Sequence, residues 1–283
     1  MRFLIWFWAL FSASAAWAEA IHLGTYVWDT DDPRLGGLSG IELSDDGSSF
    51  VAISDRGIFF SGQFNRTDGQ ISGIANLEIA EMRGPDGALF DGQNHDSEGI
   101  AIAPDGTIHV SFETVHGLRS FETITSNASA LRTDRRFADL QPNSSFEALA
   151  MTPSGDLLTM PERSGRQTRP FPVYRQSGSI WSYAFDIPRR GAFLTAGADV
   201  GPDGKLYVLE RDFIGIGFLS RVRRFDLDGS NEELILHTSA RTHDNLEGIA
   251  VWEDAQGIRL TMVADDNYRM LQQTQIVEYR LTQ

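Results

Sequence analysis

The sequence predicts an all-β protein, a single β-propeller of five blades that is closed by its amino-terminal strand. Two observations lead to this prediction. Glycine, aspartate and proline turns and apolar residues at every second position recur along the chain, whereas helical periodicity is nearly absent. In addition, a strand–turn–strand unit is repeated five times at intervals of about 50 residues, which is typical of propellers and repeat arrays.

The repeated unit is a β-hairpin. In the second copy, the apolar stretch 100–103 and the strand 108–112 flank the turn Pro104-Asp105-Gly106. Proline fixes φ in such turns, and glycine supplies the positive φ that they need. The five copies occupy residues 38–57, 94–113, 146–165, 196–212 and 246–267.

Each hairpin predicts the inner half of one blade. Its first strand has large residues on one face and small or polar residues on the other, as expected for inner strands packed between neighbouring blades. Roughly 25 further residues follow each hairpin, enough for the two outer strands of a four-stranded blade. The interval between Gly40 and Gly99 is the longest, so a six-bladed ring remains the alternative.

The two ends of the chain fit a closed ring. The fifth copy lacks one outer strand unless residues 21–28 supply it beside residues 275–281. No linker-like composition interrupts the repeat, so we expect a single propeller domain over residues 19–283.

Residues 1–18 have the features of a secretory signal peptide: a basic residue, an apolar run over 3–11 and a small-x-small site ending at Ala18. The apolar run is shorter than the roughly 20 residues that a membrane-spanning helix needs. The chain has no cysteine, which excludes disulfides and a lipid anchor on cysteine. We therefore expect a protein that is exported to a bacterial periplasm or secreted, without membrane insertion.

The formal net charge is −15. This charge argues against nucleic acids and anionic membrane surfaces as partners, because both attract positively charged proteins. We expect a monomer that acts on a small anionic or ester substrate.

Acidic residues flank the predicted inner hairpins. In a propeller, the start of each first strand and the end of each second strand lie on the same face of the disc. Three first strands are preceded by glutamate, namely Glu98, Glu147 and Glu247, and the second strands end in Asp55, Glu113, Glu162, Glu210 and Asp265. Because neighbouring carboxylates repel one another, we expect Glu98, Glu147 and Glu247 to hold a divalent cation, with Ca²⁺ as the first candidate. The alternative is that these residues only cap turns, although Ser39 and Ala196 break the pattern expected of repeated caps.

Three arginines directly follow acids at the ends of second strands: Arg56, Arg163 and Arg211. Such a pair is either a local ion pair of little energetic value or part of a site. Around a channel mouth, we expect these arginines to bind the anionic part of a substrate.

Two histidines occupy matching positions in N-H-D-S-E-G and T-H-D-N-L-E-G, namely His95 and His243. Each is followed by an aspartate, so either is a candidate general base. No G-x-S-x-G elbow, H-E-x-x-H motif or Walker loop is present, and a covalent serine mechanism has no support.

At these residues the chain resembles a bacterial family, the phytase-like domain proteins described as having the esterase-like activity of phytase. The resemblance rests on G-L-S-G-I…S-D-R-G, D-S-E-G-I-A-I-A-P-D-G and N-L-E-G-I-A…D-D-N, and extends from about Gly36 to Tyr268. It implies an exported β-propeller associated with phosphoester or carboxylester hydrolysis. The fourth copy, A-G-A-D-V-G-P-D-G, departs from the E-G pattern, which weakens the prediction of a complete acidic ring.

The sequence thus leads to two hypotheses. The first is an exported, metal-dependent hydrolase of a phosphate ester or a small carboxylic ester. The second is a non-catalytic propeller that binds a ligand or a protein at the same mouth, because propellers host both kinds of function.

Overall fold

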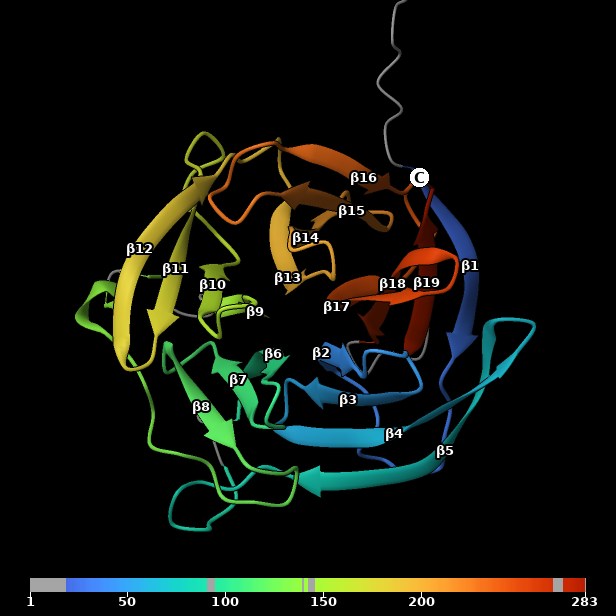
Figure 1. Cartoon of the computed structure of the whole chain (residues 1–283), viewed down its shortest axis with the longest axis horizontal. Helices are drawn as coiled ribbons and strands as arrows, with labels where there is room; N and C mark the ends of the chain where they lie inside the picture. The colour runs from blue at the N-terminus through green and yellow to red at the C-terminus, as the bar shows by residue number, and fades with distance from the viewer. Residues whose placement is uncertain (1–18, 91–94, 139, 142–145, 267–271, 283) are drawn as a thin grey trace, which may run out of the picture.

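The computed structural model describes residues 19–282, apart from 91–94, 139, 142–145 and 267–271. These residues form a five-bladed β-propeller, in which five β-sheets surround a central axis (Figure 1). The prediction of five blades is confirmed, and the six-bladed alternative is not. The long interval between Gly40 and Gly99 contains an extended outer hairpin of the first blade in place of a further blade.

The blades follow one another in chain order. Blade 1 consists of β2 (Leu38–Leu43), β3 (Ser49–Ser54), β4 (Ile58–Thr67) and β5 (Gln70–Glu81). Blade 2 consists of β6 (Ser97–Ile102), β7 (Ile108–Phe112) and β8 (Gly117–Phe121). Blade 3 consists of β9 (Phe146–Met151), β10 (Leu157–Pro161), β11 (Phe171–Ser177) and β12 (Ile180–Ile187). Blade 4 consists of β13 (Leu194–Val200), β14 (Leu206–Phe213), β15 (Phe218–Phe225) and β16 (Glu233–His237).

Blade 5 joins the two ends of the chain. It consists of β17 (Asn245–Asp254), β18 (Gly257–Asp265), β19 (Gln275–Leu281) and the amino-terminal strand β1 (Ala20–Val27). Strand β1 pairs antiparallel with β19 as the outermost strand of this blade. The predicted closure by the amino-terminal strand is therefore confirmed.

Blade 2 differs from the others because its described residues form only three strands. The segment after β8 is rich in serine, threonine and asparagine, which favour turns over strands. It contains a short 3-10 helix, Arg135–Phe137, whose Phe137 is buried against the rings of Phe146 and Trp181 in blade 3. An aromatic contact thus joins blades 2 and 3 on this side of the ring.

Glycines allow the inner strands to approach closely at the axis. A Cβ atom added to Gly197 would lie 2.6 Å from the main-chain oxygen of Glu247, and one added to Gly248 would lie 2.8 Å from the Cα atom of Gly40. The space left between the inner strands is a cavity of about 10 Å³. Between these described strands the axis is therefore almost filled.

Every inner strand carries a β-bulge near its start. In blades 1, 3, 4 and 5 the strand pairing skips one residue of the inner strand, and in blade 2 two inner-strand residues face Ser111 alone. The skipped residues are Ser39, Glu147, Ala196 and Glu247, and the equivalent residue of blade 2 is Glu98. Bulges of this kind redirect side chains and often lie beside functional sites.

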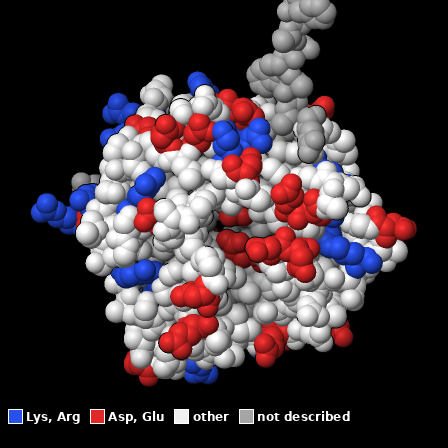
Figure 2. Space-filling model, in the orientation of Figure 1, with Lys and Arg blue, Asp and Glu red and all other residues white. Residues whose placement is uncertain are grey.

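Residues 1–18, which the sequence predicts to be a signal peptide, lie outside the described residues. Within the described part of the chain, no helix has the length and hydropathy needed to cross a membrane. Figure 2 shows one face of the propeller, where acidic side chains gather around the centre and basic side chains are scattered. This distribution agrees with the net charge of −15.

Candidate functional site

The candidate site lies at one end of the axis, where inner strands begin and their neighbours end. Cross-strand pairs place Ser97 beside Phe112, Phe146 beside Pro161, and Asn245 beside Asp265. The glutamates at the bulges therefore lie on the same face as the acids that follow the second strands, as the sequence predicts. We call this end of the axis the channel mouth.

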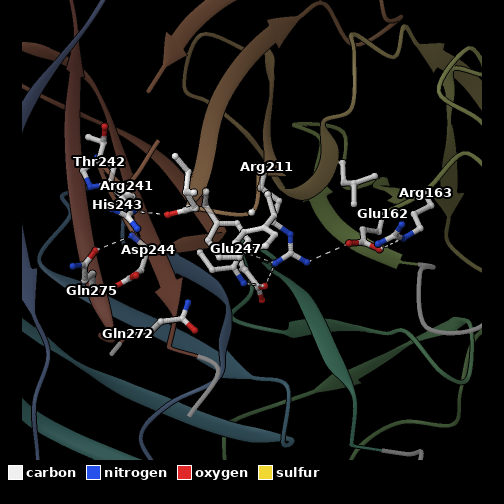
Figure 3. Close-up of a pocket in the computed structure, with 17 residues that line it drawn as sticks. Glu162, Arg163, Arg211, Arg241, Thr242, His243, Asp244, Glu247, Gln272 and Gln275 are labelled. Carbon is white, nitrogen blue, oxygen red and sulfur yellow. Dashed lines mark hydrogen bonds and ion pairs between the residues drawn. The ribbon is translucent and has the colours of Figure 1, made fainter. Parts of the chain in front are cut away.

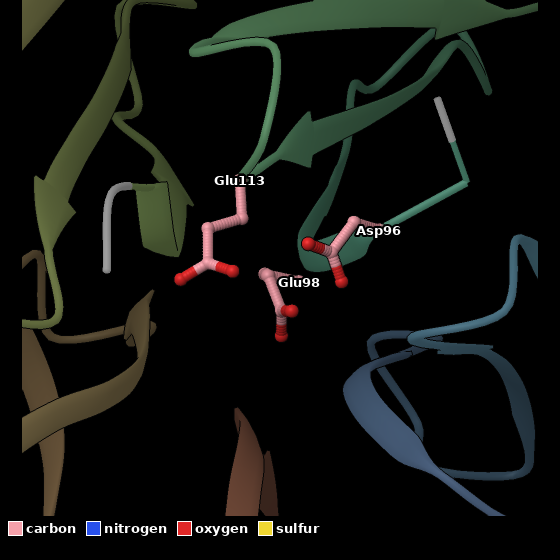
Figure 4. A group of neighbouring side chains, drawn as sticks. All are labelled: Asp96, Glu98 and Glu113. Carbon is pink, nitrogen blue, oxygen red and sulfur yellow. The ribbon is translucent and has the colours of Figure 1, made fainter. Parts of the chain in front are cut away.

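Three carboxylates of blade 2 lie together at the mouth (Figure 4). One oxygen atom each of Asp96, Glu98 and Glu113 lies within 4.8 Å of the others. The main-chain N–H of Glu113 donates a hydrogen bond of 3.0 Å to the carbonyl of Asp96, which holds the two ends of the hairpin together. The Thr114 hydroxyl donates to Asp96 Oδ2 at 2.7 Å. We call these three residues the acidic cluster.

Burial gives the acidic cluster and its neighbours unusual electrostatics. Glu98 is 8 % exposed, and its burial, followed by the charges of Glu147 and Asp96, raises its pKa well above the ordinary value. Burial also raises the pKa of Glu147, although the charge of Arg211 opposes this shift. Among the described residues, no arginine or lysine forms an ion pair with Asp96, Glu98 or Glu147. Such carboxylates are costly to ionise unless a cation joins them.

Asp55 extends this environment from blade 1. Burial and the charge of Asp265 raise the pKa of Asp55 to about 6, and Arg56 opposes the shift. The Oδ1 atom of Asp55 is buried and has no hydrogen-bond partner within the described ranges. An acceptor without a partner in such a place is suited to a proton or a cation.

The other side of the mouth contains arginine (Figure 3). Arg211 Nη1 donates to Glu247 Oε1 and, at 2.9 Å, to Asn245 Oδ1, and Arg211 Nη2 lies 3.3 Å from Glu162 Oε1. Arg163 Nε donates to Glu162 Oε2 at 2.8 Å. We call Glu162, Arg163, Arg211 and Glu247 the arginine ladder.

The predicted metal ligands therefore differ in their surroundings. Glu98 and Glu147 share the acid-rich side of the mouth, where the charge of Glu147 contributes to the raised pKa of Glu98. Glu247 instead forms an ion pair with Arg211 and accepts a hydrogen bond from Asn245. The group that the structure brings together around Glu98 contains Asp96 and Glu113, neither of which the sequence reasoning chose as a ligand. Their signal was present, because Asp96 and Glu98 form D-S-E ahead of the strand and Glu113 follows its partner strand.

The three predicted substrate-binding arginines also differ. The Arg211 side chain is 16 % exposed and is fixed by three partners. The Arg163 side chain is 49 % exposed, and its Nε donates a hydrogen bond to Glu162. Arg56 follows β3, and its charge opposes the rise in the pKa of Asp55. Arg56 and Arg163 are thus both exposed, whereas most of the Arg211 side chain is covered.

The two predicted histidines have distinct contacts. His95 Nδ1 lies 3.1 Å from the main-chain oxygen of Asp55, and since a carbonyl only accepts, Nδ1–H is the donor and the Nε2 of the neutral ring keeps its lone pair. His243 is buried, its Nε2 lies 2.7 Å from the Tyr279 hydroxyl, and its ring packs near His22. Burial, followed by the charge of His22, lowers the pKa of His243 to about 4.

A cleft of about 1240 Å³ opens beside the arginine ladder, between blades 4 and 5. Figure 3 shows Glu162 and Arg163 on one side of the view, Arg211 and Glu247 in the middle, and His243, Asp244 and Gln275 on the other side. The apolar tip of the β14–β15 hairpin, which sequence reasoning missed, also lines the cleft. The apolar residues of F-I-G-I-G-F at 213–218 are a possible signal, since they continue past the end of the predicted hairpin.

Not every acid at a strand end belongs to the mouth. Glu210, one of the predicted acids, is fully buried and forms ion pairs with Arg221 and Arg223, whose Nε atoms each lie 2.6 Å from Glu210 Oε2. Arg223 also pairs with Glu232. Glu210 is thus a structural acid within blade 4.

Solved structures with the same architecture have low sequence identity to this chain. An α-L-arabinofuranosidase from Podospora anserina has a TM-score of 0.56 at 11% identity, covering 94% of this chain and 98% of that chain. An aldose sugar dehydrogenase from Streptomyces coelicolor has a TM-score of 0.55 at 11% identity, with 92% and 98% covered. The calcium-binding protein regucalcin from Agrobacterium tumefaciens has a TM-score of 0.51 at 12% identity, with 86% and 90% covered. At such identities these similarities support the fold alone.

Family membership is shown by the sequence itself. No curated protein matches the chain significantly. The family model described as "Phytase-like: Esterase-like activity of phytase" matches residues 33–268, which is most of the chain and includes all the residues of the channel mouth. This protein is therefore a member of the phytase-like family, as the motifs around Ser39, Glu98 and Glu247 indicate.

Proposed function

We propose that this protein is an exported hydrolase of a carboxylic or phosphate ester, which acts at the channel mouth with a divalent cation, Ca²⁺ being the first candidate. The observation that carries the proposal is the acidic cluster in a member of a family named for esterase-like activity. The signal-like residues 1–18 support export to a bacterial periplasm or secretion.

The residues at the mouth fit a hard cation. Ca²⁺ binds six to eight oxygen atoms, mostly of carboxylates, carbonyls and water. Asp96, Glu98 and Glu113 offer carboxylate oxygens within 4.8 Å of one another, and the buried Asp55 Oδ1 lacks a partner in the described residues. Bound there, a divalent cation would polarise the ester and lower the pKa of a water molecule. Glu147 contributes further negative charge beside Glu98.

His95 is the stronger candidate for moving a proton. Its Nδ1–H is held by the Asp55 carbonyl, so the Nε2 of the neutral ring is free to accept a proton from water. His243 is less suited, because its Nε2 contacts Tyr279 and its burial disfavours the protonated ring. We assign His243 to the packing of β1 and β19 within blade 5, through its contacts with His22 and Tyr279.

Arg163 and Arg56 are the proposed binding groups for an anionic part of the substrate or product. The terminal nitrogens of Arg163 have no hydrogen-bond partner within the described ranges, since only its Nε is engaged with Glu162. Arg211 acts through the ladder and keeps Glu162 and Glu247 in place.

The alternative is a propeller that binds a ligand without converting it. The observation that favours it is the size of the cleft, about 1240 Å³, which accommodates a ligand larger than a small ester. A test of turnover separates the two functions.

The test uses the mature chain and two chromogenic substrates, p-nitrophenyl acetate and p-nitrophenyl phosphate. We expect hydrolysis of at least one that is lost in EDTA and restored by Ca²⁺. Glu98→Gln should lower kcat/KM by about 100-fold or more, because a cation site loses a charged ligand. The control Glu81→Gln changes an exposed acid of β5 and should have no effect. Activity that resists both EDTA and Glu98→Gln would refute the proposed site.

A further inference from the structure

The tip of the β14–β15 hairpin presents apolar side chains to the cleft. Phe213 and Ile216 are 60% and 62% exposed, and both line the cleft together with Leu194 and Phe218. Single exposed apolar residues are common on protein surfaces. Several that share one concave wall beside polar groups are instead typical of ligand sites.

The tip is held in position by the segment between β16 and β17. Arg241 donates from Nε to the carbonyl of Ile216 and from its main-chain N–H to the carbonyl of Phe218. Gly217 has no room for a side chain, because an added Cβ would lie 2.5 Å from Arg241 Cγ. The rings of Phe213 and Phe218 lie 5.0 Å apart. Hydrogen bonds and ring packing therefore hold the apolar wall in place.

The charges of the cleft do not suit a polyanion. Its described lining residues include three arginines and three acids, listed as Arg163, Arg211, Arg241, Glu162, Asp244 and Glu247. Arg211 is neutralised by its ladder partners, and Arg241 is engaged with the tip. A substrate with several phosphate groups needs an excess of cations, which this cleft and a chain of net charge −15 do not provide.

The cleft adjoins the acidic cluster. The Ser111 hydroxyl, two residues before Glu113 of the cluster, donates a hydrogen bond of 2.8 Å to the main-chain oxygen of Phe146 in blade 3. Phe146 pairs across the sheet with Pro161, which directly precedes Glu162 in the lining of the cleft. If the reacting group of a substrate lies at the acidic cluster, the rest of the substrate can therefore occupy the adjoining cleft.

We propose that the hairpin tip around Phe213 and Ile216 binds the apolar acyl group of the substrate, so that the enzyme prefers carboxylic esters with a medium-length acyl chain over acetate esters and over polyphosphorylated sugars. This proposal rests on the proposed function and specifies its substrate class. In the reaction, the oxygen of water bonds to the acyl carbon and the bond from that carbon to the alcohol oxygen breaks. One water proton goes to the leaving alcohol, and the other is released as the carboxylic acid ionises.

The first experiment measures kcat/KM for p-nitrophenyl acetate, butyrate and octanoate. We expect the octanoate to exceed the acetate by about 10-fold or more, because each added methylene contacts the apolar wall. Phe213→Ser and Ile216→Ser should remove most of this preference, by lowering kcat/KM for the octanoate much more than for the acetate. Ile180→Ser is the matched control, since Ile180 is 70% exposed on β12 and does not line the cleft.

The second experiment measures binding without turnover, by calorimetric titration of octanoate, acetate and inositol hexakisphosphate. We expect octanoate to bind wild type and the Ile180→Ser control, and to bind Ile216→Ser at least about 10-fold more weakly. Acetate and inositol hexakisphosphate should bind weakly or not at all.

The outcomes separate the two proposals. Ester hydrolysis that depends on Glu98 but shows no chain-length preference, or no loss in Ile216→Ser beyond Ile180→Ser, overturns the apolar subsite and leaves the hydrolase standing. Absence of hydrolysis with Ile216-dependent octanoate binding overturns the hydrolase and supports the subsite. Phosphate release from inositol hexakisphosphate that is faster than hydrolysis of any carboxylic ester overturns the substrate class.

Discussion

The two sides of the channel mouth are built from the same repeat but differ in whether their acids are paired with arginine. On the side of blades 4 and 5, Glu247 pairs with Arg211 at the mouth, and Glu210, which lies within blade 4 and outside the mouth, pairs with Arg221 and Arg223. On the side of blades 2 and 3, Glu98 and Glu147 occupy the same bulge position as Glu247. Within the described residues neither forms an ion pair with arginine, and burial raises the pKa of both.

This difference separates acids that stabilise the fold from acids that are available for chemistry. A buried carboxylate with two arginines is satisfied, and its removal leaves uncompensated cations. A buried group of carboxylates without such partners is costly by itself and is a candidate functional site for that reason. For blade 2 one cause is visible in the repeat: Glu113 at its strand end is followed by Thr114, whereas the corresponding acids of blades 1, 3 and 4 are followed by arginine.

The largest expected effect tests the compensated side. Glu210→Gln should lower the free energy of unfolding by about 3–5 kcal/mol, because it leaves Arg221 and Arg223 buried without their shared carboxylate. Urea denaturation followed by tryptophan fluorescence measures this loss. Glu233→Gln, which breaks an ion pair of the partly exposed Glu233 with Arg224, is the control and should cost less than about 1 kcal/mol. A loss for Glu210→Gln no larger than that of the control would contradict the role given to Glu210.

The second prediction tests the acidic side with a cation. At a Ca²⁺ concentration about 100 times its dissociation constant, binding to the folded state alone adds about 2.7 kcal/mol of stability. We expect Ca²⁺ to raise the Tm of the EDTA-treated protein, as measured by differential scanning fluorimetry, and Glu98→Gln to lose most of the increase. Variants of Glu210 that still fold should keep the increase in Tm on adding Ca²⁺. An equal increase in wild type and Glu98→Gln would place the cation elsewhere.

The third prediction compares the two histidines, which lie on opposite sides of the mouth. His95→Asn should lower kcat by about 100-fold or more, because a positioned general base contributes roughly 10²–10⁴-fold. His243→Asn should affect kcat less and lower the Tm, since it breaks the contact with Tyr279. Steady-state kinetics and differential scanning fluorimetry of both variants measure the two effects. The reverse pattern would exchange their roles.

The smallest expected effect concerns the pH dependence of stability in EDTA. Because the folded protein raises the pKa of Glu98 above 4.5, protonated Glu98 favours folding, and this contribution is lost as the pH rises through the raised pKa. Glu98→Gln cannot ionise, so it should match wild type near pH 4 and be more stable than wild type near pH 8. Urea denaturation at both pH values measures the difference. A difference that does not vary with pH would show that the Glu98 carboxylate is not destabilised in the fold.

Much of the architecture was predictable because its signals are local. Alternating apolar residues, turn residues and the spacing of the hairpins define five blades, and the strand missing from the fifth copy points to β1. The prediction that acids from several blades meet at one mouth also holds, because strand direction alone places them there. The missing fourth strand of blade 2 was not predicted, since residue counts between hairpins do not distinguish a strand from a loop.

The sequence by itself determined the propeller, its closure and the end of the axis at which most of the predicted acids meet. Only the tertiary structure decided how they combine. Arg211 pairs with Glu247, 36 residues away, and contacts Glu162, 49 residues away, while Glu98 is grouped with Asp96 and Glu113. The physical reason is that strand patterns depend on near neighbours in the chain, whereas ion pairs and pKa shifts depend on distance and burial in space, which the packing of the blades sets.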